Sequence, residues 1–181
     1  MNNREKLRWL AFDHHGIVTT DQAAAVGVPA VELRKLAARG ALSRVGFGVY
    51  RMNEAPTSTP TPYAQALAVV GPGSMLADES ILALHELPVV NPRPIKVATH
   101  HRVRTKLPAT IELIHGVTTG AVEVVDGLAT MPLKDALQRS RSCDVRWNSH
   151  QLPTENLLLQ DPSLTPRIVV AVQQLLEICS S

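Results

Sequence analysis

Two adjacent cations, Arg34 and Lys35, are the residues of this sequence whose type and spacing best suit a chemical task. They lie in Pro29–Arg39, where apolar residues repeat at helical spacing. The apolar side of this predicted helix holds Leu33, Leu36 and Ala37. The opposite side holds the two cations, Arg34 and Lys35, together with the smaller residues Val31 and Ala38. Because such cations contact phosphates, and Arg also binds the O6/N7 edge of guanine, the pattern predicts a helix that binds duplex DNA.

Three further cations follow closely in the sequence. Arg39 ends the helix before Gly40, and Arg44 and Arg51 fall in a predicted hairpin. The hairpin has strands Leu42–Val45 and Val49–Met52 and the turn Gly46-Phe47-Gly48. Its arginines are placed for phosphate or minor-groove contact. We therefore predict five DNA-binding residues: Arg34, Lys35, Arg39, Arg44 and Arg51. A solvated charged face or a protein-docking module is the alternative.

Two further helices and a turn are predicted before this helix. The stretch Arg4–His15 has apolar positions at helical spacing, and Gly16 can end that helix. Thr19 and Gln22 fit a capping box that opens a short alanine helix to Val26. Gly27 makes the turn, and Pro29 suits the first position of the next helix. Helix, helix, turn, helix and hairpin form the order of a winged helix-turn-helix.

A proline-rich segment divides the chain. The stretch 53–62, "NEAPTSTPTP", has three prolines and no apolar periodicity, which predicts an extended linker. Residues 1–51 hold eight basic and four acidic residues, a balance of +4, and the other 130 residues have a balance of −2. We therefore predict a basic winged helix-turn-helix domain at 1–52, a linker at 53–62 and a second domain at 63–181.

The second domain has a mixed pattern, so the predicted fold class is α/β (α+β). Its predicted helices are 63–70, 78–87, 133–139 and 165–179. Its predicted strands are 95–99, 111–115, 122–125 and 128–131, with Asp126-Gly127 as a hairpin turn. The stretch 141–164 is left unassigned. The basic loop 102–106 is a solvated loop, or it contacts phosphates or an acidic protein surface.

Several function classes find little support in the sequence. No apolar run is long enough to span a bilayer, and two cysteines cannot form a disulfide scaffold, so we expect a cytoplasmic protein without membrane contact. The seven histidines show no metal-ligand spacing, and no phosphate-cradling glycine loop or nucleophilic triad is visible. The pairs Asp78-Glu79 and His85-Glu86 could serve a metal-dependent nuclease, but Asp78 also suits a helix cap. We predict no enzyme activity, no cofactor and no metal.

A family resemblance rests on the N-terminal stretch. The segment "GIVTTDQAAAVGVPAVELRKLAARGALSRVGFGVYRM" resembles the N-terminal domain of AbiEi-type antitoxins, from type IV toxin–antitoxin and abortive-infection systems. That family has a Gly-Ile/Val-Val/Ile-Thr start, an alanine-rich helix, a basic recognition helix and a wing that ends in Gly-Val-Tyr-Arg. Gly48-Val49-Tyr50-Arg51 matches this ending.

Weaker likeness continues to about residue 140. The segment "MLADESILALHELP" resembles a family helix of the form Ser-His-Glu-Ser-Ala-(x)-Ala-Leu-His-Gly-Leu. Ala77-Asp78 stands in place of the Ser-His pair, and Glu86 stands in place of the usual glycine. The segments "PIKVATHHRVR" and "VVDGLATMPLKDAL" resemble later blocks of the family.

The resemblance implies an antitoxin that binds its own double-stranded promoter DNA as an autorepressor and counteracts a nucleotidyltransferase-like toxin. It leaves open whether the toxin is contacted directly and whether the protein forms a cooperative oligomer on DNA. Two alternatives remain at this point. The first is a transcriptional regulator that senses a ligand in its second domain, and the second is the metal-dependent nuclease.

Overall fold

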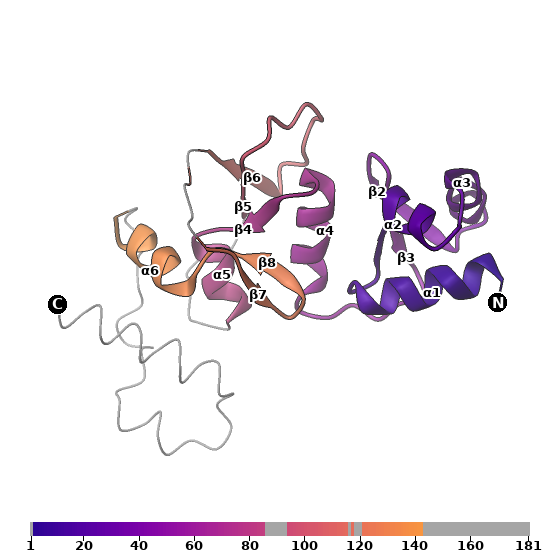
Figure 1. Ribbon diagram of the computed structural model, residues 1–181, viewed down its shortest axis with the longest axis horizontal. Coiled ribbons are helices and arrows are strands. Elements are labelled where there is room, and N and C mark those ends of the chain that lie inside the picture. The colour runs from indigo at the N-terminus through magenta and orange to yellow at the C-terminus, as the bar shows by residue number, and fades with distance from the viewer. Residues whose placement is uncertain (1, 86–93, 116, 118–120, 143–181) are drawn as a thin grey trace, which may run out of the picture.

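The computed structural model describes residues 2–85, 94–115, 117 and 121–142 (Figure 1). The described chain combines helices with two sheets, so the predicted mixed α/β class is confirmed. The predicted helix at 165–179 lies outside the described residues. So does the unassigned stretch, apart from its first two residues, which end a helix.

Three helices begin the chain in the predicted order: α1 (Asn3–Asp13), α2 (Thr20–Ala25) and α3 (Ala30–Ala38). The capping box of α2 is confirmed, because the Gln22 amide donates to Thr19 Oγ1 and the Thr19 amide donates to Gln22 Oε1. A second capping box, between Asn2 and Glu5, opens α1 and was not predicted. Pro29 is the N-cap of α3, one position earlier than expected.

The first sheet has three strands in the order β1-β3-β2. The predicted hairpin is confirmed as β2 (Leu42–Gly46) and β3 (Val49–Met52), with a register shift between Arg44 and Gly46. The strand β1 (Ile17–Thr19) was not predicted. It has three residues between a helix end and a helix cap, so its apolar pattern is too short to indicate a strand. Only its pairing with β3 defines it.

The two faces of the first sheet are covered by different parts of the chain. One face presents Val18, Tyr50 and Met52 to the helices α1–α3, where they share a core with Leu7 and Leu33. The other face presents Ile17 and Val49 to α4 (Thr61–Val70), and these residues belong to the core of the second sheet. Strand alternation explains the division, since neighbouring residues point to opposite faces.

The second sheet has five strands in the order β6-β5-β4-β8-β7. They are β4 (Ser74–Leu76), β5 (Ile95–Thr99), β6 (Ile111–Ile114), β7 (Glu123–Val125) and β8 (Leu128–Thr130). All except β4 were predicted. The three residues of β4 are all buried and show no alternation of apolar and polar residues, so their pattern does not indicate a strand. Asp126 and Gly127 form the predicted turn, and both have positive φ angles.

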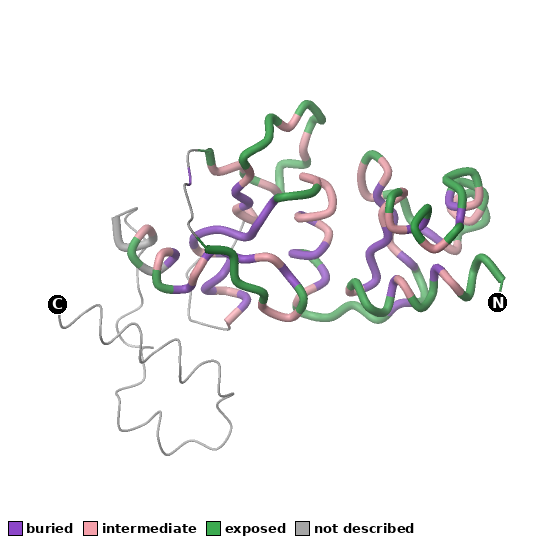
Figure 2. Tube along the Cα trace, viewed as in Figure 1, coloured by how far each residue is buried: buried purple, intermediate pink, exposed green. Residues whose placement is uncertain are grey.

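Helix α4 lies between the two sheets (Figure 1). The helices α5 (Glu79–Leu84) and α6 (Leu133–Ser142) pack on each other and lie on the other side of the second sheet (Figure 1). Figure 2 shows buried strands on both sides of α4. The last two residues of the predicted linker, Thr61 and Pro62, belong to α4, which begins two residues earlier than predicted. The core on α4 includes residues from both sides of the linker. A division of the chain at 53–62 into independent folding units stays a prediction.

Candidate nucleic-acid interface

The outer face of α3 is the first part of the candidate interface. Arg34, Lys35 and Ala38 are exposed, and Val31 is 47% exposed. Leu33 is completely buried on the opposite side, where Leu36 and Ala37 pack against the same core. The predicted two-sided helix is therefore confirmed. Its small exposed neighbours leave room for a close approach of the helix to a groove.

The two cations of this face differ in their partners. Lys35 Nζ lies 2.8 Å from Glu32 Oε1, one helical turn earlier, and both side chains are solvent-accessible. An exposed pair of this kind contributes little free energy, so a phosphate can displace Glu32. No carboxylate partner of Arg34 is found among the described residues. Arg34 can therefore bind an anion without first breaking an ion pair, unlike Lys35.

The end of α3 adds a third cation. Arg39 is the exposed C-cap residue, and Gly40 follows it with a φ of 75°. The Gly40 amide donates to Ala37 O and the Ala41 amide donates to Leu36 O, which closes the last turn. Gly40 thereby turns the chain directly into β2, so that α3 and the hairpin stay close together.

The hairpin carries the fourth predicted cation. Arg44 is exposed, donates from Nε to Gly46 O at 3.2 Å, and has its guanidinium carbon 5.9 Å from the centre of the Phe47 ring. Phe47 itself is 80% exposed at the turn. The stacking orients Arg44 along the hairpin while its remaining N–H groups face water.

Arg51 has a different environment from the other four predicted residues. It lies in the central strand β3, is only partly exposed, and donates from a terminal nitrogen to Thr57 Oγ1 in the predicted linker. Its Nε is buried without a hydrogen-bond partner among the described residues. Arg51 therefore joins the hairpin to the segment before α4. A phosphate contact by Arg51 stays a prediction.

Two of the side chains considered for a nuclease, Asp78 and Glu79, face cations of the second region, and Glu86 lies outside the described residues. Asp78 is at the N-cap position of α5 with a φ of 49°, but its side chain makes no capping hydrogen bond. Its carboxylate accepts from Arg139 Nε at 2.6 Å instead, which corrects the predicted cap. Glu79 Oε2 lies 2.7 Å from Lys96 Nζ, and the two side chains form an ion pair. Within the described part of the chain, no group of three metal-binding side chains occurs.

One histidine makes a contact that was not predicted from the sequence. His15 has a φ of 53° at the end of α1, and its Nε2 lies 2.6 Å from the backbone oxygen of Asp126, in the turn between β7 and β8. This hydrogen bond joins the winged region, which is residues 3–52 from α1 to β3, to the second sheet. The left-handed conformation of His15 is the one unusual feature at this position. Because a non-glycine residue rarely adopts that conformation, the sequence did not predict it.

The basic loop after β5 is exposed at all three of its cations, Arg102, Arg104 and Lys106. His101, just before it, approaches Gly73 in the turn between α4 and β4. The alternatives for this loop therefore stay open. No helix in the described residues is both long and apolar enough to cross a membrane.

Comparison with known families finds a match in the N-terminal part of the chain. Residues 5–53 match a family described as "Transcriptional regulator, AbiEi antitoxin". The AbiEi resemblance is confirmed over this range, and the weaker likeness beyond residue 53 stays a prediction. The matched range contains α1 except for its first two residues, together with β1, α2, α3 and the hairpin. All five cations predicted to bind DNA therefore lie within it. A comparison with curated protein sequences finds no match. The AbiEi family is one of regulators, which agrees with a binding rather than a catalytic role for this region.

Proposed function

We propose that the protein is an antitoxin that binds its own promoter DNA as an autorepressor and counteracts a nucleotidyltransferase-like toxin. One observation carries the DNA-binding part. The exposed face of α3 presents Arg34 and Lys35 beside the hairpin cation Arg44, in the winged order of an AbiEi-type region. The family description supports the regulatory and antitoxin roles.

The proposed orientation places α3 in the major groove. Arg34 contacts a base edge there, because it has no competing carboxylate among the described residues and lies at the middle of the helix. Lys35 and Arg39 contact phosphates on either side, and Arg44 contacts the phosphate backbone from the hairpin. Arg51 extends this contact only if DNA displaces Thr57.

The full chain with a duplex from upstream of its own coding sequence tests this proposal. Fluorescence anisotropy is measured at several salt concentrations, and log K should fall linearly with log[salt]. Removal of one phosphate contact, as in Arg39→Ala, should lower the slope by about 1. Arg8→Ala is the matched control, because Arg8 is an exposed cation of α1 that stacks on Phe12 and is not one of the five predicted DNA-binding residues.

A salt-independent affinity, or an equal effect of Arg39→Ala and Arg8→Ala, would show that this face does not bind DNA. The full chain is the appropriate protein for this test. A fragment that ends at residue 52 would expose Ile17 and Val49, which are only 2% and 3% exposed when α4 covers them.

The antitoxin part needs a separate test. The toxin is expressed from an unrelated promoter, so that repression cannot imitate neutralisation, and growth is measured with and without the full chain. A folded Arg34→Glu/Lys35→Glu variant should lose repression but keep rescue, since the two tasks would use separate surfaces. If rescue is lost as well, the winged region itself engages the toxin.

A further inference from the structure

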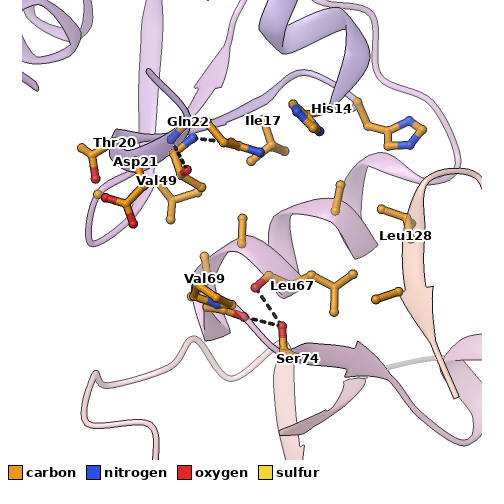
Figure 3. Close-up of a pocket in the computed structure, with 18 of the residues that line it drawn as sticks. His14, Ile17, Thr20, Asp21, Gln22, Val49, Leu67, Val69, Ser74 and Leu128 are labelled. Atoms are coloured by element: carbon orange, nitrogen blue, oxygen red, sulfur yellow. Dashed lines mark hydrogen bonds between the residues drawn. The ribbon is translucent and has the colours of Figure 1, made fainter. Parts of the chain in front are cut away.

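A cavity of about 590 Å³ lies between the first sheet and α4 (Figure 3). One wall comes from Ile17, Val49 and the start of α2, and the other comes from Leu67, Val69 and the strand β8. Cavities of roughly 300–1,000 Å³ at the junction of two structural units are common sites for small organic ligands. This cavity is not used by the proposed DNA contact.

The interior of the cavity is apolar between two polar ends. Figure 3 shows Ile17 and Val49 on one side and Leu67 and Val69 on the other. Thr20, Asp21 and Gln22 lie together at one end, and His14 lies toward the other end (Figure 3). A ligand that fits this cavity needs an apolar body that fills the space between the two apolar walls.

The charges around the cavity restrict the ligand further. Asp13 and Asp21 are both exposed and line the cavity, whereas no lysine or arginine of the described chain does. The hydroxyl of Ser74, on the α4 side, already donates to the backbone oxygens of Leu67 and Gly71. Two carboxylates without a cation favour a positively charged ligand and oppose carboxylates and phosphates.

We propose that this cavity binds a small apolar molecule that carries a cationic amine, with its apolar body between the first sheet and α4. The amine lies at the Asp21 end. Arginine and lysine side chains of the described protein do not compete for that position, because none lines the cavity.

Occupancy of the cavity should be transmitted to the DNA-binding helix. The wall includes Thr20 and Gln22 of α2, which packs directly on α3, and Phe47 at the tip of the hairpin. Opposite them, Leu128 follows the turn whose Asp126 oxygen meets His15. A ligand between these walls changes how the winged region rests on α4. This coupling, unlike the site itself, rests on the proposed DNA-binding function.

The site is tested with two fluorescent probes of equal length and opposite charge. Dansylcadaverine ends in an amine, and N-dansyl-6-aminohexanoate ends in a carboxylate on the same chain of carbons. Dansyl emission rises and shifts to the blue when the probe leaves water, so titration of the full chain measures affinity without DNA. We expect saturable binding of the amine and at least about tenfold weaker binding of the carboxylate.

Two variants locate the bound probe. Ala68→Phe fills the cavity from α4 and should weaken amine binding by about tenfold or more. Asp21→Asn removes one carboxylate without a change of volume and should weaken it by about two- to fivefold. Ala24→Phe, on the exposed side of α2 and outside the cavity, is the matched control and should have no effect. Circular dichroism checks that each variant folds.

Equal binding of the two probes, or unchanged amine binding in folded Ala68→Phe and Asp21→Asn proteins, would overturn the site. The coupling is measured separately, as the change in promoter affinity caused by Ala68→Phe, which imitates an occupied cavity. If the probe binds as expected but promoter affinity is unchanged, the site stands and the coupling is wrong. If the wild-type chain binds no DNA at all, the proposed function fails, while the probe titration still decides the site.

Discussion

The winged region leaves Arg34, Arg39 and Arg44 in solvent, whereas the second sheet and its helices hold Lys96 and Arg139 against carboxylates. The acid that faces Arg139, Asp78, is 4% exposed, and Glu79, which faces Lys96, is 12% exposed. The acid that faces Lys35 in the winged region is 31% exposed. The same residue types therefore have different roles in the two regions.

The difference follows from the cost of removing charge from water. A buried carboxylate without a partner is costly, so Asp78 and Glu79 need their cations for stability. The exposed cations of α3 keep their hydration and can exchange it for phosphate at little cost. We infer that loss of charge at Asp78 or Glu79 impairs folding, whereas loss of charge on the exposed face of α3 impairs binding.

The largest expected effect on folding is at Asp78. Asp78→Asn keeps the size of the side chain and tolerates the left-handed backbone, but removes the buried negative charge that faces Arg139. We expect a loss of about 2–3 kcal/mol in the free energy of unfolding, measured by urea denaturation of the full chain. Asp135→Asn, in the first turn of α6, is the control and should change it by less than about 1 kcal/mol. Equal losses in the two variants would remove the contrast between the regions.

The matching effect on binding is at Arg34. Arg34→Ala should weaken promoter binding by about 1–3 kcal/mol and relax base preference at one position of the site. Arg44→Ala should weaken all DNA sequences about equally, because its contact is to the phosphate backbone. Neither change should alter the urea midpoint appreciably, since both side chains are exposed. An Arg34→Ala protein with unchanged base preference would contradict the proposed groove orientation.

The contact between the two regions can be tested at Gly46. A methyl group at this position would lie 2.8 Å from Val69 Cγ2 on α4, so the hairpin or the helix must move. We expect Gly46→Ala to cost about 1–2 kcal/mol of stability. In the double variant with Val69→Ala the cost should be smaller than the sum of the single effects. Additive losses would show that the hairpin does not pack on α4 in solution.

The smallest effect is expected at high pH from Lys96. Burial of the amine acts to lower its pKa, but the hydrogen bond and charge of Glu79, with Asp78 and Glu112, raise the pKa above the ordinary value of 10.5. Because the raised pKa belongs to the folded state, this stabilisation is fully present below about pH 10 and is lost as pH rises through the folded pKa.

Comparison of the wild type with Glu79→Gln isolates the contribution of the Lys96–Glu79 pair to the free energy of unfolding. The wild type should be more stable at neutral pH by about 1 kcal/mol, and the difference should shrink above pH 10.5. Urea unfolding at a series of pH values measures it. A difference that stays constant or grows with pH would mean that Glu79 acts on stability without Lys96.

The sequence alone determined the winged region closely. The Thr19–Gln22 capping box, the glycine after α3 and the separation of Leu33 from Arg34 are local signals, and each one acts within a few residues along the chain. For that reason α2, α3, the hairpin and the AbiEi resemblance were predicted correctly, together with the exposed side of α3.

The tertiary structure decided what lies far apart in sequence. The short strands β1 and β4 exist only because distant strands pair with them. The side chain of Asp78 does not cap its helix but accepts a hydrogen bond from Arg139, 61 residues away in the sequence. The meeting of His15 with Asp126, and the cavity between the first sheet and α4, likewise depend on packing across the predicted linker. Local pattern reports which face of an element is apolar, but only the folded chain decides which partner covers that face.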